Sequence, residues 1–376
     1  MQIESLHLTH FRNYEELSLE PGMGLNVFVG RNAQGKSNLL EAAYVLATSK
    51  STRAGKDTEL IEFGSDAGAV RANIVREQSP NVEIELRISH SEKKAFRLNG
   101  VRHTKLAEVI GQLNTVLFDS GDLEIVRGDP SYRRRFLDLE ISQTSPRYVH
   151  ALGSYRKTLE QRNRLLRDLR DARIGADGRA VLPAYNEQLA VHGALLMERR
   201  LQFLTTLALL AAEVHQRLSD RRDELSLRYD PSFSLDGAFT ADEIKVRFLE
   251  ELENVGYDEI ARGTTLRGPQ RDDVLFSVNG QECRLFGSQG QQRTVALSLK
   301  LAERQLLTDL MGEPPILLLD DVLSDLDDVR RRHLFALTDT AGSQTFLSCT
   351  NLRAFSEPVL SGASVFGVSA GKVQKQ

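Results

Sequence analysis

The stretch Gly30-Arg31-Asn32-Ala33-Gln34-Gly35-Lys36-Ser37 decides the fold, because it fits the pattern G-x-x-x-x-G-K-[ST] of a phosphate-binding loop. The apolar run Leu25 to Val29 before it predicts a buried strand, and residues 38–47 after it predict a helix whose N-terminus faces the phosphates. In such a loop the backbone cradles phosphate oxygens, the lysine reaches the terminal phosphates and the hydroxyl ligates Mg²⁺. The sequence therefore predicts an α/β nucleotide-binding fold. The candidate nucleotide-binding residues are Gly30, Arg31, Asn32, Ala33, Gln34, Gly35, Lys36, Ser37 and Asn38.

A second motif carries two carboxylates. Ile316 to Leu319 predict a buried parallel strand, and Asp320 and Asp321 follow at its carboxyl end, where open α/β sheets bind ligands. We expect Asp320, with Ser37, to hold Mg²⁺ and Asp321 to orient or deprotonate the attacking water. Paired aspartates after a strand are also common as a helix cap or a solvated turn. With Lys36, Asp320 and Asp321 are the candidate catalytic residues.

Between these motifs, Ser288-Gln289-Gly290-Gln291-Gln292 opens a strongly helical stretch from Arg293 to Leu310. The serine hydroxyl, the glycine backbone and the helix N-terminus together suit an anion. A nucleotide bound by Lys36 hardly needs a second such device from its own subunit. We therefore expect Ser288, Gln289, Gly290 and Gln291 to contact the nucleotide of a second copy, the alternative being a plain helix cap.

Composition limits the function classes. The 376 residues carry a formal net charge of -4, so nucleic-acid binding would need a local basic surface. Two cysteines, Cys283 and Cys349, give neither a disulfide framework nor a zinc spacing. The chain opens on a strand-like segment without a basic-then-apolar leader, and its longest apolar stretch, near residues 201–212, is too short to span a bilayer. We expect a cytoplasmic protein in a reducing compartment.

The sequence pattern changes twice along the chain. Residues 1–129 are strand-rich, with alternating apolar residues from Val82 to Ile88 and a hairpin signal at Asn99-Gly100. Residues 130–263 are charged and helical, with a coiled-coil-like 3,4 spacing of apolar residues, a break at Gly175 to Pro183 and a capping box formed by Thr240 and Glu243. Residues 264–376 return to a strand pattern. We predict an ATPase head in two parts, 1–129 and 264–376, separated by a helical arm insertion, 130–263.

The order of motifs resembles the ABC-type ATPases, in which the signature loop of one subunit caps the γ-phosphate held by another. A helical insertion between phosphate loop and signature is similar to the SMC-like branch, and nearly the whole chain resembles the RecF family of bacterial recombination mediators. The segments that carry this resemblance are Phe11-Arg12-Asn13-Tyr14, the phosphate loop, residues 133–138 (RRRFLD), residues 268–273 (GPQRDD), SQGQQRTVALSLKLAE and ILLLDDVLSDLD. The implied fold is an ABC-type P-loop ATPase head with a mixed sheet and an inserted helical arm.

This resemblance also implies a function. It implies ATP and Mg²⁺ as cofactors, an ATP-dependent homodimer on double-stranded DNA at gaps or single-strand/double-strand junctions, and weak DNA-dependent ATP hydrolysis that releases the DNA. The implied partners are RecR, through it RecO, and indirectly RecA, whose loading would be helped during DNA repair, the SOS response to damage and replication-fork maintenance.

Roles carry over to matching positions only. Lys36 and Ser37 match the phosphate-loop lysine and Mg²⁺ ligand, Asn32 a loop position that contacts phosphate or water, and Ser288, Gly290 and Gln291 the signature. Asp325 lies in the segment that crosses the dimer interface. Three features depart from the ABC pattern: Asp321 stands where many members have Glu, which is consistent with slow turnover; residues 348–351 lack the usual histidine; and no Q-loop glutamine follows Phe118.

Basic residues in three groups are the candidate contacts to DNA phosphates, although groups of this size are usually solvated faces. Few aromatic residues are interleaved with them, which favours the duplex backbone over base stacking on single strands. The groups are Lys50, Arg53 and Lys56; Lys93, Lys94, Arg97, Arg102 and Lys105; and Arg133, Arg134 and Arg135.

Other functions stay open. The ATPase subunit of a membrane transporter, or another SMC-like ATPase, would share the three motifs. The long arm and the lack of an aromatic adenine platform upstream of Gly30 disfavour the transporter. An ATP-driven nuclease would need metal-binding carboxylates beyond Asp320 and Asp321.

Overall fold

The computed structural model describes the chain except residues 78, 174–175, 323–330, 332–333, 336–341, 353–354 and 356–359. The chain forms two compact units. Unit 1 comprises Met1–Leu123, Val214–Arg222 and Arg293–Gln376, and unit 2 comprises Glu124–Glu213 and Asp223–Gln292. Residues 264–292, which we expected with the head, therefore pack within unit 2. The division into an ATPase head and a helical arm at residues 129/130 and 263/264 stays a prediction.

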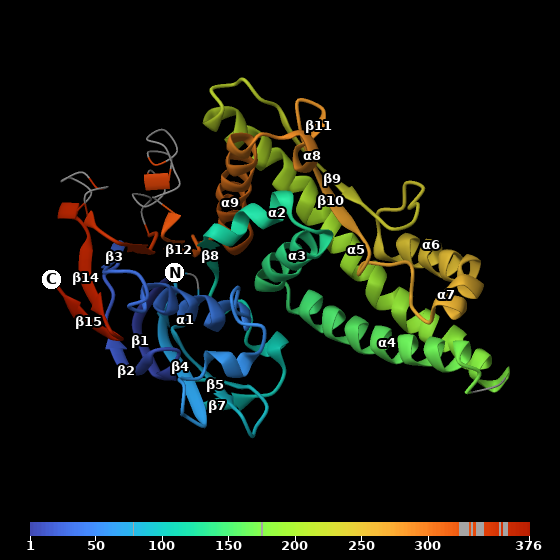
Figure 1. Ribbon diagram of the computed structural model, residues 1–376, viewed down its shortest axis with the longest axis horizontal. Coiled ribbons are helices and arrows are strands. Elements are labelled where there is room, and N and C mark those ends of the chain that lie inside the picture. The colour runs from blue at the N-terminus through green and yellow to red at the C-terminus, as the bar shows by residue number, and fades with distance from the viewer. Residues whose placement is uncertain are drawn as a thin grey trace. The chain divides into compact units, whose positions relative to one another are not determined.

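Unit 1 contains a six-stranded sheet that carries the phosphate loop (Figure 1). Its strand order is β15 (Lys372–Lys375), β14 (Ser364–Ser369), β3 (Leu25–Val29), β13 (Thr345–Cys349), β12 (Ile316–Asp320) and β8 (Thr115–Phe118). All neighbours are parallel except β14 and β15. The strands predicted at residues 25–29 and 316–319 are thus confirmed, and their carboxyl ends meet at one edge of the sheet.

A second six-stranded sheet in unit 1 is antiparallel throughout. Its order is β2 (Tyr14–Leu19), β1 (Gln2–Phe11), β4 (Ala67–Val75), β5 (Val82–Ser89), β6 (Ala95–Leu98) and β7 (Val101–His103). The predicted turn at Asn99-Gly100 connects β6 and β7, with φ of 48° and 79°. A type I′ hairpin turn needs positive φ at both positions, which asparagine and glycine tolerate best.

Helix α1 (Lys36–Thr48) lies between the two sheets (Figure 1). It contacts β8, β12 and β13 on one side and β1, β4 and β5 on the other. Every residue from Leu39 to Thr48 is consequently buried. The helix is therefore apolar nearly all round, as expected for a helix covered on more than one side.

The two faces of the parallel sheet bury alternate residues of each strand. In β12, Ile316 and Leu318 pack in the α1 cluster, whereas Leu317 and Leu319 pack in a cluster with Leu297 of α9 (Gln289–Met311). This two-sided burial explains why the strand reads as a continuous apolar run. The short 3₁₀ helices η1 (Asp57–Leu60), η2 (Leu106–Glu108) and η3 (Ser120–Asp122) complete the described elements of unit 1.

Unit 2 is mainly helical and also contains a small antiparallel sheet. The helices are α2 (Leu123–Arg127), α3 (Pro130–Thr144), α4 (Pro146–Arg170), α5 (Ala176–Leu218), α6 (Ala241–Asn254), α7 (Gly256–Arg262) and α8 (Cys283–Phe286), and the strand order is β11 (Gln281–Glu282), β10 (Asp273–Val278), β9 (Leu225–Asp230). The predicted capping box is confirmed, since Thr240 and Glu243 satisfy each other's backbone N–H groups at the start of α6.

The predicted break from Gly175 to Pro183 is wrong in extent, because α5 already begins at Ala176 and runs through Pro183. Proline removes one N–H donor, but its fixed φ is compatible with a helix. The inside of unit 2 also holds a buried ion pair, Arg162 with Glu259 at 2.5 Å. In the described residues no helix is long and apolar enough to cross a membrane.

Leu40→Ala tests the packing of α1 between the sheets. Leu40 is completely buried in the larger core cluster, so we expect the unfolding free energy to fall by about 2–5 kcal/mol. Urea unfolding followed by circular dichroism measures this change. Leu209→Ala is the matched control, because Leu209 is 71% exposed and its loss should stay within about 0.5 kcal/mol. Equal effects of the two substitutions would contradict the packing described.

Candidate nucleotide site

The phosphate loop connects the end of β3 to the start of α1, and both motif glycines are required by close contacts. Gly35 has φ of 115°, and a Cβ there would lie 2.7 Å from Asn13 Nδ2 and 2.9 Å from the Tyr14 hydroxyl. A Cβ on Gly30 would lie 2.3 Å from the backbone oxygen of Val368. The two glycines thus let the loop pass between the β1–β2 hairpin and β14.

Lys36 and Ser37 face the centre of the site. Lys36 is buried, and its ammonium donates hydrogen bonds to the backbone oxygens of Gly30 at 2.8 Å and Arg31 at 2.9 Å. The Ser37 hydroxyl donates to Asp320 Oδ1 at 2.7 Å, although the two residues are 283 positions apart. The loop and the acidic strand therefore meet as the sequence predicted.

Ser348 on β13 links the two aspartates. Its hydroxyl donates to Asp320 Oδ1 at 2.7 Å and accepts the Asp321 N–H at 3.0 Å. Asp321 is exposed and has φ of 53°, a left-handed conformation that aspartate tolerates better than most residues. Asp320 is thereby fixed beside Ser37, while the carboxylate of Asp321 lies at the edge of the pocket.

The pocket at this edge has a volume of about 400 Å³. It is lined by Asn13, Asn32, Ala33, Gly35, Lys36, Ser37, Asn38, Arg53, Asp321 and Ser348. Seven of these are predicted site residues, whereas Asn13, Arg53 and Ser348 were not assigned to the nucleotide. Of the other predicted residues, Gly30 and Arg31 hold the lysine through their carbonyls, Gln34 braces the loop as described below, and Asp320 bonds Ser37.

The residues fit a magnesium ion with few protein ligands. A hydroxyl and a carboxylate oxygen 2.7 Å apart at the mouth of a phosphate loop are the donors that Mg²⁺ takes alongside water and phosphate oxygens. No cluster of three or more His, Cys, Asp or Glu that could hold a metal occurs among the described residues.

The Phe11 to Tyr14 segment supports the loop from the neighbouring sheet. Asn13 Nδ2 donates to the Gln34 backbone oxygen at 3.1 Å, and the Tyr14 hydroxyl donates to the Gly35 oxygen at 3.0 Å. Asn38 Nδ2 in turn donates to Asn13 Oδ1 at 2.7 Å. The β1–β2 turn thus fixes the loop backbone, which explains this part of the motif in physical terms.

The β14–β15 turn supports the loop from the other side. The Ala370 N–H donates to Gln34 Oε1 at 2.8 Å, and the Gly371 N–H donates to the Gln34 oxygen at 3.1 Å. A Cβ on Gly371 would lie 2.3 Å from the Asn13 oxygen, and its φ is 75°, so glycine is required there. Gln34 is therefore a structural brace of the loop in this structure.

Glu41 is a buried carboxylate in the otherwise apolar α1. It accepts hydrogen bonds from Arg12 Nε at 2.9 Å and Nη2 at 2.8 Å, from Ser51 Oγ at 2.5 Å and from Arg53 Nη2 at 2.7 Å. Burial raises the pKa of Glu41, but the hydrogen bonds from Arg12 and Ser51 and the charges of both arginines outweigh it and lower the pKa below its usual value. An acidic residue inside an apolar helix was the sequence signal for this cluster.

The signature residues cap α9. Ser288 Oγ accepts the Gln291 N–H at 3.2 Å, and Gln291 Oε1 accepts the Ser288 N–H at 3.0 Å. Ser288, Gln289 and Gly290 are exposed. This reciprocal cap leaves the start of a 23-residue helix open to solvent. The contact with a second copy's nucleotide stays a prediction, and Asp325 lies outside the described residues.

The basic residues predicted to contact DNA fall into two classes in the structure: some are paired with other residues of the protein, and others are exposed. Lys94 donates to the Ser49 oxygen and pairs with Asp57, Arg133 is buried against Asp273 at 2.6 Å, and Arg134 donates to the Asp272 oxygen. The charged groups of these three residues are already paired within the protein. Arg53 lines the nucleotide pocket. Lys50, Lys56, Lys105 and Arg135 are exposed.

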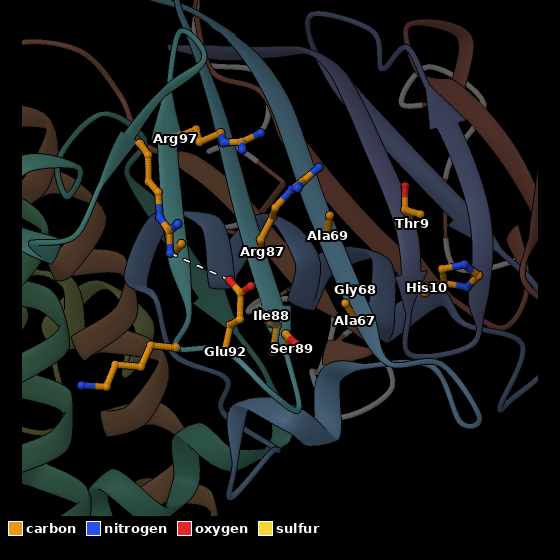
Figure 2. Close-up of a pocket in the computed structure, with 13 residues that line it drawn as sticks. Thr9, His10, Ala67, Gly68, Ala69, Arg87, Ile88, Ser89, Glu92 and Arg97 are labelled. Atoms are coloured by element: carbon orange, nitrogen blue, oxygen red, sulfur yellow. Dashed lines mark ion pairs between the residues drawn. The ribbon is translucent and has the colours of Figure 1, made fainter.

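Lys93, Arg97 and Arg102 instead line a separate cavity of about 400 Å³ on the antiparallel sheet, together with Arg87. Figure 2 shows Arg87 and Arg97 on neighbouring strands, with Ala69, Thr9 and His10 toward the other side. Glu92 is the only carboxylate in this lining, and it lies 4.0 Å from Arg102. Glu85 is not part of the lining, and it pairs with Arg87 at 2.6 Å and with Arg97 at 3.4 Å, so four basic side chains still face one carboxylate in the cavity. The cavity is therefore basic.

Comparisons with known proteins show which family the chain resembles. Residues 2–372 match the family described as the RecF/RecN/SMC N terminal domain. The DNA replication and repair protein RecF of Bacillus cytotoxicus is 43% identical over 373 residues, covering 99% of this chain and 98% of that protein. RecF of Bacillus pumilus is 42% identical, covering 99% and 100%.

Solved structures are similar too. The recombination mediator protein RecF with ATP, of the RecFOR pathway, has a TM-score of 0.91 and 32% identity, covering 100% of this chain and 97% of that one. An Smc head domain from Pyrococcus furiosus has a TM-score of 0.55 at 16% identity, covering 100% of this chain and 96% of that one. The predicted fold, an ATPase head of the ABC and SMC type with added helices, is thereby confirmed.

Glu41→Gln removes the charge that Arg12 and Arg53 share. Because a buried ion pair that loses one partner is costly, we expect the unfolding free energy at pH 7 to fall by about 3 kcal/mol. The lowered pKa means that the carboxylate stabilises the fold fully above its ordinary value of 4.5 and loses this effect as the pH falls through the lower folded value. The difference between wild type and variant should therefore shrink below that pH.

Urea unfolding of both proteins from pH 7 down to pH 3 measures this difference. Glu16→Gln, at an exposed position on β2, is the control and should change stability by less than about 0.5 kcal/mol. A wild-type advantage that is independent of pH would show that Glu41 is not the charged partner described.

Proposed function

The chain belongs to the RecF family, as the earlier resemblance indicated, and from this premise we propose that it is an ATP-gated DNA-binding protein of replication and repair. In this proposal ATP closes a homodimer on double-stranded DNA at gaps or single-strand/double-strand junctions, and slow hydrolysis opens it. The observation that carries the proposal is the bond between Ser37 and Asp320, which joins the phosphate loop to the acidic strand.

Lys36 is the residue that binds the terminal phosphates. Its ammonium now lies on two carbonyls of its own loop, so a triphosphate would replace those acceptors without a large movement. Ser37 and Asp320 would hold Mg²⁺, which supplies positive charge against the phosphates. Asp321, at the pocket edge, orients the attacking water and accepts its proton. Its shorter reach compared with glutamate supports slow turnover.

The second half of the site comes from another copy in this proposal. The exposed start of α9 at Ser288 offers free space beside a helix N-terminus, which suits the γ-phosphate of a partner's nucleotide. The recombination mediators similar to this chain include ATP-bound forms. A shared nucleotide makes closure depend on ATP, because the anion is what attracts the second helix terminus.

DNA and protein partners complete the proposal. The basic cavity with Arg87, Lys93, Arg97 and Arg102 contacts phosphates of the duplex backbone, since its lining has four basic side chains against one carboxylate and contains no Phe, Tyr or Trp. RecR, and RecO through it, then act with the clamp, and RecA loading is the indirect outcome. The naming of the RecFOR pathway for a similar protein supports these partners.

Ser288→Arg tests the shared site. We expect ATP affinity within about twofold of wild type but loss of the ATP-dependent dimer. The bulky arginine side chain would fill the space at the start of α9 that the γ-phosphate bound by the partner must enter. Lys36→Ala is the comparison, which should abolish ATP binding and therefore the dimer as well. Calorimetry measures binding, and sedimentation with and without ATP measures the dimer. Normal dimerisation of the Ser288→Arg variant would contradict a shared site.

Arg87→Gln combined with Arg102→Gln tests the DNA surface. Duplex affinity should fall, and the slope of log K against log salt should decrease by about 1.8, since each phosphate contact contributes about 0.9. ATP affinity should not change, because both residues lie outside the nucleotide pocket. Arg228→Gln, 71% exposed in unit 2, is the matched control. An unchanged salt slope in the double variant would place the duplex elsewhere.

A further inference from the structure

A larger cavity of about 800 Å³ adjoins the nucleotide pocket, since the two share lining residues. Asn13 and Asn38 line both spaces, whereas Asp321 lines only the smaller one. The rest of the larger cavity is lined by Arg12, by Thr58 and Glu59 of η1, by Ile61 to Asp66 between η1 and β4, and by His90. A molecule that fills the pocket can therefore extend past the two asparagines into this cavity.

The direction of a bound triphosphate follows from the phosphate loop. The lysine reaches the β- and γ-phosphates and the loop backbone cradles the α- and β-phosphates, so the nucleoside leaves on the side away from the catalytic carboxylates. Asp321 marks the terminal phosphate side, and Asn38, in the first turn of α1, belongs to the other. The larger cavity is thus where the sugar and base extend.

Phe63 lines this cavity and is fully exposed, with a relative accessibility of 103%. A phenyl ring left wholly in water gains nothing from burial, so an unpartnered one beside a ligand pocket suits contact with that ligand. Hydrogen bonds also hold the backbone on both sides of Phe63. The Glu62 N–H donates to the His10 oxygen at 2.9 Å, the Ser65 N–H donates to the Glu62 oxygen at 3.1 Å, and Glu62 Oε2 contacts His10 Nδ1 at 2.7 Å.

The charges of the cavity exclude another anion. Glu59, Glu62 and Asp66 bring carboxylates to its lining, against the guanidinium of Arg12, which already bonds Glu41 and the Glu59 oxygen. A phosphate or a nucleic-acid backbone would meet these carboxylates, whereas a neutral heterocycle with amino groups would not. A purine offers a flat face for the ring and N–H donors at its edge.

We propose that Phe63 is the platform on which the base of the bound nucleotide stacks. This proposal deepens the proposed function and rests on it, because it takes the triphosphate at Lys36 as given. The platform follows the phosphate loop in the chain, which is why a search for an aromatic residue upstream of Gly30 does not find it. Stacking accepts either purine, so ATP and GTP both use the ring.

Phe63→Ala tests the platform by comparing two ligands in the presence of Mg²⁺. ATP affinity should fall roughly 5- to 100-fold, the range that base-aromatic stacking supplies, whereas the affinity for inorganic tripolyphosphate should change less than about twofold. Titration calorimetry measures both. Phe63→Tyr keeps the ring and should bind ATP like wild type. Phe239→Ala, which removes a half-exposed phenyl ring in unit 2, should leave both affinities unchanged.

The outcomes separate the two proposals. Unchanged ATP affinity in Phe63→Ala, or equal weakening of ATP and tripolyphosphate, would overturn the stacking role. Failure of Phe63→Tyr to keep ATP affinity would overturn it too. If the wild-type chain bound neither ligand, the proposed function itself would fail at Lys36, and the platform would fall with it.

Discussion

The burial of α1 between two sheets is the constraint on which the rest of the structure depends. The helix begins at Lys36, so the packing that fixes its axis also fixes the phosphate loop. Glu41 is anchored inside this sandwich by Arg12 from one sheet and by Arg53 from the segment after the helix. Because the helix is held on all sides, neither the loop nor the first turn can shift independently, and the site is preorganised for its ligand.

The local sequence predicted those parts of the fold that depend on local chemistry. The phosphate loop, the apolar strand before it and the acidic strand all lie where their motifs indicated. The Asn99-Gly100 turn and the Thr240 capping box were also readable, because positive φ and helix capping are satisfied within four residues. The phosphate loop and Asp320 both follow the carboxyl ends of parallel strands. Because those ends lie at the same edge of the sheet, the contact of Ser37 with Asp320 also followed from the predicted topology.

What the sequence could not show depends on distant partners. Lys94 and Arg133 look like surface cations, yet Asp57 and Asp273 bind them inside the protein. Arg53 looked like a DNA contact because Glu41 signals a buried charge in α1 but does not show that Arg53 is its partner. Pro183 looked like a helix stop, yet α5 runs through it, because the fixed φ of proline is compatible with a helix. For Lys94, Arg133 and Arg53 a tertiary contact outweighs the local signal.

The phosphate loop is braced by the β14–β15 turn, which the ribosome makes much later than the loop. Ala370 bonds a residue 336 positions earlier, and β3 is paired on both sides with strands from the same late part of the chain. At about 5–20 residues per second, the ribosome makes these partners roughly 20 to 70 seconds after the loop. A nascent chain therefore carries a complete phosphate motif well before the residues that brace its loop have been made.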